Sequence, residues 1–183
     1  MDDSTATART VEVVAYDPAW PKQFAVEQSL LAQALPDALA IEHIGSTSVP
    51  GLCAKPTIDV LVVVADVNLV LDRTAALTRL GYEHRPGSFA EDPEHLFFRK
   101  VENGKRTHHL HVLEAGSPVP EQYRLFRDFL IADGEAAARY GRAKQDLARR
   151  YATERARYVA EKPQVVDALI AQARRWRTAT QRD

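Results

Sequence analysis

The stretch HIGSTSVPGLCAKPTIDVLVVV, residues 43–64, decides the fold, because a turn rich in small hydroxyl residues leads directly into a strand. Residues 60–64 form a continuous apolar run, which is typical of a strand buried on both faces. Asp59 lies inside the strand segment, and Lys55 precedes it. The stretch is therefore either a phosphate-holding turn followed by a metal-binding carboxylate, or a polar loop that enters a buried strand.

The turn carries the groups that an anion site needs. Gly45 can adopt backbone angles that are closed to other residues. The turn amides can form an anion-binding nest, and positive charge and hydroxyl donors come from Lys55, Ser46, Thr47 and Ser48. We predict phosphate or substrate binding by these five residues.

A carboxylate that rises from a strand beside such a turn suits divalent-metal chemistry. Mg²⁺, the metal we expect, takes one or two protein carboxylates and completes its shell with phosphate oxygens and water. The alternative is that Asp59 only caps a strand end. We favour the functional interpretation, because an unpaired buried carboxylate is costly.

A second set of polar residues lies in THHLHV, residues 107–112. Alternate side chains of a strand share a face, so Thr107, His109 and His111 are predicted to point together. Two imidazoles on one face can bind metal, contact phosphate or transfer protons, or they can be a half-exposed pair without function. The candidate catalytic and metal-binding residues are thus Asp59, His109 and His111.

The strand that precedes the histidines is expected to form a hairpin with them around Asn103-Gly104. With a two-residue turn, Lys100 would share the face of His109. A loop of odd length would shift the register by one residue and place Arg99 there instead. The sequence does not choose between these registers, so both basic residues are candidate ligands of a phosphate.

Basic residues also recur in the last third of the chain. Charges along helices usually form a solvated face, and a ligand role is the alternative. We retain Arg127, Lys144 and Lys162 as candidate phosphate or substrate ligands. The aromatic residues of this region are predicted to pack the helices together: Tyr123, Phe126, Tyr140, Tyr151 and Tyr158.

The hydrophobic periodicity predicts the remaining elements. Expected strands lie at 11–15, 40–44, 60–64, 82–85, 95–101 and 107–113, and expected helices at 21–35, 66–80 and 120–176, the last with breaks at Asp133-Gly134 and Lys162-Pro163. This order predicts an α+β (α/β-like) fold, a mixed sheet with helices on its faces and a C-terminal helical layer. Residues 1–9 are predicted to be a disordered tail, and residues 10–183 a single domain.

Composition excludes several classes of protein. The 24 Lys and Arg residues balance 25 Asp and Glu residues, which does not suggest a nucleic-acid binder. Cys53 is the only cysteine, so no intramolecular disulfide can form, and a reducing compartment such as the cytoplasm is expected. There is no signal peptide and no apolar run of ~20 residues, so no membrane partner is expected. The oligomeric state is not predicted.

Several motifs together resemble the GrpB family of small bacterial proteins. They are VVAYDPAWPKQF, IEHIGSTSVPGLCAKPTIDVLVVV, FFRK, THHLHVLEAGS, FRDFL and the pairs Tyr140/Lys144 and Tyr158/Lys162. The family is placed in the nucleotidyltransferase-like superfamily that includes DNA polymerase beta. It also occurs as a domain attached to dephospho-CoA kinase. The resemblance implies a nucleotidyltransferase-type fold and a nucleotide-related setting.

The superfamily pattern is a Gly-Ser turn followed by a strand with two acidic residues separated by one residue, and often a third acid on a later strand. Gly45 and Ser46 match the turn, and Asp59 matches the second acid. Thr57 stands at the first acidic position, and histidines stand near the third, so a full two-metal carboxylate site is absent. Three alternatives remain: one metal held by Asp59 and histidine, basic residues in place of the metal's charge, or binding without catalysis.

We therefore expect a protein that binds a nucleotide or another phosphorylated small molecule and transfers a nucleotidyl or phosphoryl group to a small acceptor. One alternative is a non-catalytic module that binds a phosphorylated ligand. Another is a metal-dependent hydrolase that uses His109 and His111.

Overall fold

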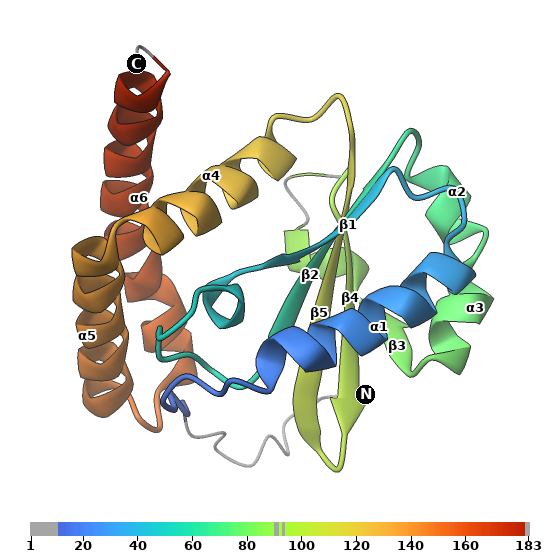
Figure 1. The fold of residues 1–183 in the computed structure, drawn as a ribbon. Helices are drawn as coiled ribbons and strands as arrows, with labels where there is room; N and C mark the ends of the chain where they lie inside the picture. The colour runs from blue at the N-terminus through green and yellow to red at the C-terminus, as the bar shows by residue number, and fades with distance from the viewer. Residues whose placement is uncertain (1–10, 90–91, 93, 182–183) are drawn as a thin grey trace.

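The computed structural model describes residues 11–89, 92 and 94–181, except for the side chains of Arg155 and Lys162. Its α-helices are α1 (Trp20–Ala34), α2 (Asn68–Leu71), α3 (Thr74–Arg79), α4 (Val119–Ala132), α5 (Gly134–Arg150) and α6 (Arg155–Thr180). Its strands are β1 (Ala40–Ile44), β2 (Ile58–Val64), β3 (Tyr82–His84), β4 (Leu96–Glu102) and β5 (Lys105–Glu114). Two 3₁₀ turns, η1 (Ser46–Ser48) and η2 (Pro86–Phe89), complete the described elements (Figure 1).

The five strands form one mixed sheet in the order β1-β2-β5-β4-β3. β2 and β5 run parallel, and the other neighbouring pairs are antiparallel. The apolar run of β2 lies in the interior of this sheet, and its residues from Val60 to Val64 are buried, as the sequence predicts. The buried strand brings Asp59 beside His109 in the parallel register.

Helices cover both faces of the sheet (Figure 1). On one face, α1 and α3 pack over Val60, Val62 and Leu110 through residues such as Leu31 and Leu77. On the other face, Ile44, Leu61, Val63 and Leu113 form a smaller cluster that α4 covers with Val119 and Tyr123. The predicted mixed sheet with helices on its faces is thereby confirmed.

The predicted C-terminal helical layer is also present. Helices α4, α5 and α6 pack on one another around Phe129, Tyr140 and Leu169. The predicted break at Asp133-Gly134 is confirmed, because the Asp133 side chain caps α5 by accepting from the amide of Ala136. This layer faces the same side of the sheet as Asp59, and it therefore forms the second wall of the site described below.

Three predicted elements differ from the structure. Residues 11–15 form no strand, because only Val14 pairs, in an isolated bridge with Ala54. The helix expected at 66–80 is divided into α2 and α3, where the hydroxyl of Thr74 donates to the carbonyl of Leu71 and competes with the helical pattern. The predicted break at Lys162-Pro163 is wrong, since α6 continues through Pro163 and packs against α4.

The β4–β5 hairpin settles the register that the sequence left open. The turn has two residues, Asn103 and Gly104, both with positive φ. A bulge nevertheless follows, because Val101 pairs with Arg106 and Lys100 with His108, so that Thr107 is the extra residue. The bulge shifts the register by one and pairs Arg99 with His109. Arg99, and not Lys100, therefore shares the face of His109.

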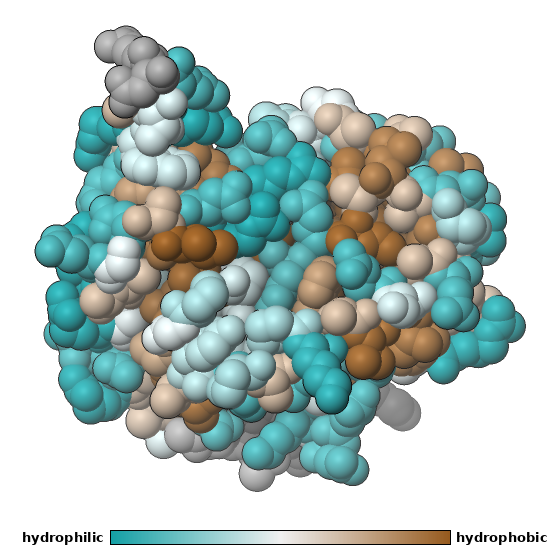
Figure 2. All heavy atoms as spheres, in the orientation of Figure 1, coloured by the Kyte–Doolittle hydropathy of each residue, from teal (hydrophilic) through white to brown (hydrophobic). Residues whose placement is uncertain are grey.

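No helix within the described part of the chain is both long and apolar enough to span a membrane. Apolar side chains do gather on the surface around α1 and α2, as Figure 2 shows. Exposed residues in this region are Val26, Leu30, Leu39, Leu69 and Leu71.

Candidate functional site

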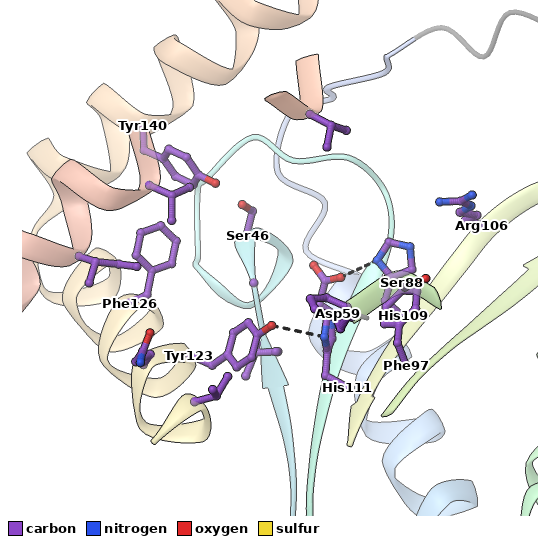
Figure 3. Close-up of a pocket in the computed structure, with 18 residues that line it drawn as sticks. Ser46, Asp59, Ser88, Phe97, Arg106, His109, His111, Tyr123, Phe126 and Tyr140 are labelled. Carbon is purple, nitrogen blue, oxygen red and sulfur yellow. Dashed lines mark hydrogen bonds and ion pairs between the residues drawn. The ribbon is translucent and has the colours of Figure 1, made fainter. Parts of the chain in front are cut away.

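A cavity of about 660 Å³ opens between the sheet and the helices α4, α5 and α6 (Figure 3). Its sheet side is largely polar, and its helical side is largely apolar. The polar lining comes from Gly45, Ser46, Asp59, Ser88, Arg106, His109, His111 and Gln122, and the apolar lining from Ile44, Phe89, Phe97, Val119, Tyr123, Phe126, Tyr140, Val159, Val166 and Ile170. The predicted trio Asp59, His109 and His111 thus lies along one cavity, beside the Gly45-Ser46 turn.

The turn is fitted closely around Asp59. Gly45 has φ +72° and ψ −170°, a conformation that only glycine adopts readily. A Cβ atom on Gly45 would overlap the Oδ2 atom of Asp59, so a glycine is required here for space as well. The hydroxyl of Ser48 donates to the carbonyl of Gly45 at 2.6 Å and closes the turn.

Asp59 and His109 form a hydrogen-bonded pair on adjacent strands. The Nδ1 atom of His109 lies 2.9 Å from the Oδ1 atom of Asp59 (Figure 3). The side chain of His109 is 19% exposed and that of Asp59 is 28% exposed, so the pair is half-buried, and both residues line the cavity. A carboxylate in this position accepts the Nδ1–H of imidazole and thereby leaves Nε2 as the basic nitrogen.

His111 belongs to a second hydrogen-bonded group. Its Nδ1 atom lies 2.9 Å from Nε2 of His95 and 3.4 Å from the hydroxyl of Tyr123. Burial lowers the pKa of His95 and raises the pKa of Tyr123. These groups are therefore neutral near pH 7, and the His95 ring also stacks on Phe89 at 3.8 Å between centroids.

The donor set does not fit the metal centre that the superfamily implies. No group of three or more His, Cys, Asp or Glu that could hold a metal ion occurs within residues 11–89, 92 and 94–181. Thr57, at the position of the first acid, is buried and donates its hydroxyl to the backbone carbonyl of Arg106. Oδ1 of Asp59 is engaged by His109, and His111 contacts His95 and Tyr123 instead of turning toward Asp59. No step of the chemistry below is therefore assigned to a metal.

Arg106 is a cavity residue that sequence reasoning missed. Strict alternation along the strand would place Thr107 on the face of His109 and Arg106 on the opposite face. The bulge at Thr107 reverses this, because Arg106 pairs with Val101 and comes to the cavity face. No sequence signal marks a bulge at this position. Arg106 is the basic side chain other than histidine that lines this cavity among the described residues.

The remaining predicted turn residues lie outside the cavity lining. Thr47 is buried, and its hydroxyl contacts Nε2 of His43 at 2.9 Å, because the 3₁₀ turn directs this side chain inward. Ser48 uses its hydroxyl within the turn, and Lys55 is exposed and does not line the cavity. Of the predicted phosphate-binding residues around the turn, the structure brings Gly45 and Ser46 to the cavity.

The two basic residues of β4 do not line the cavity either. Lys100 lies on the opposite face of the sheet, where Nζ is 3.1 Å from the carboxylate of the buried Glu27. Arg99 shares the face of His109 but forms an ion pair with the exposed Glu83 at 2.9 Å. The placement of Lys100 argues against a ligand role, because its side chain points away from the cavity and pairs with Glu27.

The basic residues of the helical layer hold the fold together. Arg127 donates to the carboxylate of Glu42 at 3.0 Å and to the carbonyl of His43, and so ties α4 to β1. Burial by itself would raise the pKa of Glu42, but Arg124 and Arg127 outweigh burial and lower it. Lys144 is buried, donates to the carbonyl of Cys53 and lies 4.4 Å from the Tyr140 ring centroid. The side chain of Lys162 lies outside the described residues.

The aromatic residues of the helical layer have a second role beside the predicted packing. Phe126 and Tyr140 pack edge to face with ring centroids 5.5 Å apart, and both line the cavity together with Tyr123. Figure 3 shows the three rings along α4 and α5, opposite Asp59 and Ser46. They give the cavity an aromatic wall, which the sequence alone does not distinguish from core.

Comparison with known proteins assigns the family. The model of the family described as GrpB protein matches residues 10–172. The chain belongs to the GrpB family. A UPF0157 protein of Pseudomonas aeruginosa is 40% identical, with 93% of this chain and 70% of that protein covered. The UPF0157 protein YqkA of Bacillus subtilis is 34% identical over 92% of this chain. The match covers 49% of YqkA, so this chain spans about half the length of that protein.

Solved structures agree with this assignment. The crystal structure of the conserved protein GrpB from Enterococcus faecalis matches with a TM-score of 0.81 and 35% identity, covering 88% of this chain and 96% of that one. A cytoplasmic RNA terminal U-transferase matches with a TM-score of 0.51 and 14% identity, over 72% of this chain and 40% of that chain. This second likeness shows a nucleotidyltransferase-type fold and nothing of the reaction.

Some relatives carry the name of an enzyme. A dephospho-CoA kinase of Mycobacterium tuberculosis is 30% identical, with 85% of this chain and 44% of that protein covered. More than half of the kinase's length therefore lies outside the region that resembles this GrpB-family chain.

Proposed function

We propose that this GrpB-family protein binds a nucleotide or another phosphorylated small molecule in the cavity between the sheet and α4–α6. A single observation carries the proposal: the Gly45-Ser46 turn, the Asp59–His109 pair and an aromatic wall border one cavity. The nucleotidyltransferase-type fold supports the nucleotide class by analogy of fold alone. The transfer of a nucleotidyl or phosphoryl group to a small acceptor is the activity that we propose for the site.

The two halves of the cavity suit the two ends of such a ligand. Arg106, the amide of Ser46 and the Ser46 hydroxyl lie on the polar side, where they can contact an anionic group. Tyr123, Phe126 and Tyr140 lie on the other side, where a base or another flat apolar group can stack. A ligand that is anionic at one end and apolar at the other end complements both.

The charge of the cavity limits how many phosphates the protein can hold unaided. The carboxylate of Asp59 stands against the turn and repels an anion, while Arg106 attracts one. We therefore expect a ligand with one or two phosphates to bind without a metal. A triphosphate would bind only with added Mg²⁺, and this is the role that we propose for the predicted magnesium.

A non-catalytic phosphate-binding module is the second candidate. Thr57 favours this candidate, because it stands at the position of the first acid of the superfamily pattern and donates its hydroxyl to the backbone carbonyl of Arg106. The dephospho-CoA kinase relative favours a nucleotide-related role for such a module, because the region similar to this chain makes up only 44% of a longer protein that is named as a kinase. The His109/His111 metal-dependent hydrolase gains no support, because the two rings have different partners.

A thermal-shift screen tests the binding proposal. Nucleoside mono-, di- and triphosphates, phosphorylated metabolites and their unphosphorylated forms are added in excess EDTA and, separately, with Mg²⁺. A ligand present at about a hundredfold excess over its dissociation constant stabilises the folded state by ~2.7 kcal/mol. The proposal requires a phosphorylated compound to raise the melting temperature while its unphosphorylated form does not.

A matched pair of variants locates the binding site. Val159 lines the cavity and is 54% exposed, so Val159→Trp should narrow the cavity without unfolding the helix. Ala160 is exposed on the same helix and does not line the cavity, so Ala160→Trp is the control. Equal ligand-induced shifts in both variants would place the ligand elsewhere and contradict the proposal.

A further inference from the structure

The Asp59–His109 pair has the features of a proton-transfer dyad. The carboxylate lies on the Nδ1 side of the ring, at 2.9 Å, which fixes the tautomer with hydrogen on Nδ1. The Nε2 atom is shielded from water and has no hydrogen-bond partner among the described residues. Buried polar atoms are usually paired, so an orphaned Nε2 beside a cavity calls for a partner from a ligand.

The surroundings hold this pair in one geometry. Gly45 packs against Oδ2 of Asp59 so closely that a Cβ atom would not fit, and the ring centroids of Phe97 and His109 lie 5.2 Å apart. The pairing of Asp59 with His109 in the parallel register fixes the distance between their backbones. A base that is held in place in this way loses little entropy when it acts.

The same residues that make a dyad argue against a metal. The Oδ1 atom of Asp59 is already paired with His109, and a second acid is absent because Thr57 occupies that position. Arg106 lines the same cavity and supplies a fixed positive charge that a metal would otherwise supply. Positioned cations are the main requirement for phosphoryl transfer, and the charge can come from arginine.

We propose that Asp59 and His109 form a metal-independent dyad in which Nε2 of His109 takes the proton of the hydroxyl group that attacks a phosphoanhydride in the cavity. This inference rests on the proposed function and adds to it the base, the charge source and the substrate class. His109 is the catalytic residue, Asp59 is a positioning residue that acts through it, and ligand binding must open access to Nε2.

The step balances without a further reactant. The O–H bond of the acceptor, a small alcohol or water, breaks as its proton passes to Nε2 of His109. A new P–O bond forms, and the phosphoanhydride P–O bond breaks with its electron pair on the leaving phosphate. The imidazolium is stabilised by the carboxylate of Asp59, and Arg106, which lines the same cavity, can offset the charge that develops on the phosphoryl group.

The first test reads the tautomer by long-range ¹H–¹⁵N NMR of protein labelled at histidine, with the His109 signals assigned from the His109→Gln spectrum. In excess EDTA, the signals should be those of the Nδ1–H tautomer. Mg²⁺ alone should leave them unchanged, and Asp59→Asn should lower the Nδ1–H fraction. An Nε2–H tautomer in the wild-type protein, or a shift caused by Mg²⁺ alone, would overturn the dyad.

The second test measures turnover of the four ribonucleoside diphosphates, which we expect to bind without a metal, with glycerol as acceptor, by ³¹P NMR. We expect turnover in EDTA, reduced about 10²-fold or more in His109→Gln, as is usual for the loss of a general base. His108→Gln changes a histidine on the opposite face, beside Glu27, and should keep the wild-type rate if its melting curve shows it folded.

The outcomes separate this inference from the proposed function. Nucleotides that bind, judged by the thermal shift, but turn over only with Mg²⁺ or not at all overturn the inference and leave the binding proposal standing. If none of the nucleotides binds, the proposed nucleotide function fails, and the catalytic inference fails with it. Equal rates in wild type and His109→Gln overturn the inference alone.

Discussion

Gly45 and Asp59 are packed so tightly that the carboxylate occupies the space where any other residue at position 45 would place its Cβ atom. The turn and the strand are therefore built around each other. Asp59 is fixed from one side by Gly45 and from the other side by His109. The residue with positive φ, Gly45, therefore stands fourteen residues before Asp59, the only acidic residue of β2, and the two are in direct contact.

Gly45→Ala should be strongly destabilising. It adds a strained backbone conformation to an overlap with Asp59, which together should lower the free energy of unfolding by about 2–4 kcal/mol. Gly51 also has a positive φ, of 78°, but no atom lies within 4 Å of its Cβ position, so Gly51→Ala isolates the backbone cost of ~1 kcal/mol. Urea unfolding measures both, and equal losses would contradict the close packing.

Ser46 and Ser48 should separate binding from stability. Ser46 lines the cavity, so Ser46→Ala should weaken binding of the phosphorylated ligand about fivefold to tenfold, as one lost hydrogen bond does, and leave the melting temperature unchanged. Ser48→Ala removes the 2.6 Å bond to the Gly45 carbonyl and should cost ~1 kcal/mol of stability. Calorimetric titration and melting curves check both; a Ser46→Ala protein with full affinity would exclude the Ser46 hydroxyl as a ligand.

The Glu27–Lys100 pair should prove structural. Their side chains are 5% and 13% exposed, so Glu27→Gln leaves the Lys100 ammonium with only the more distant, exposed Glu102 at 3.6 Å and should cost about 3 kcal/mol. The double change Glu27→Gln with Lys100→Met should recover most of that loss. Asp37→Asn breaks the exposed pair with Arg73 and should cost less than about 1 kcal/mol.

Ligand affinity provides the complementary measurement for this pair. Because Lys100 lies on the face opposite the cavity, the double variant should bind the phosphorylated ligand as the wild type does. A loss of affinity in a folded double variant would restore Lys100 as a ligand residue.

The free energy of unfolding should fall in acid, because His43 is held neutral by burial in the folded protein. Burial lowers the pKa of His43 from 6.5 to about 4, so the unfolded chain binds more protons between these values. The contribution of His43 is then present above about pH 6.5 and is lost as the pH falls toward 4. Since the ring is partly accessible to water, we expect on the order of 1–2 kcal/mol over this window.

The pH dependence can be assigned by substitution. His95 and His108, whose pKa values burial also lowers, act in the same direction. His43→Asn should therefore reduce the slope of unfolding free energy against pH between 4 and 6.5 without abolishing it. Urea unfolding at a series of pH values gives the slope, and an unchanged slope in the variant would disprove the assignment to His43.

The sequence determined the secondary-structure elements and the side-chain directions that depend on near neighbours in the chain. The β-branched run of β2, the Asn103-Gly104 turn and the Asp133 cap are local signals, and each marks a feature of the structure. Alternation along β5 also placed His109 and His111 on one face. These predictions succeed because side-chain direction in a strand, and capping at a helix end, follow from the local backbone.

Only the tertiary structure decided what lies opposite those residues. The bulge at Thr107 moved Arg106 to the cavity and Lys100 away from it, and a one-residue change in register exchanges the two faces of a strand. Helices far along the chain supplied the aromatic wall, and Lys144 turned to a backbone carbonyl instead of the cavity. Which side chains meet across the cavity depends on long-range packing, and the local sequence pattern carries no record of it.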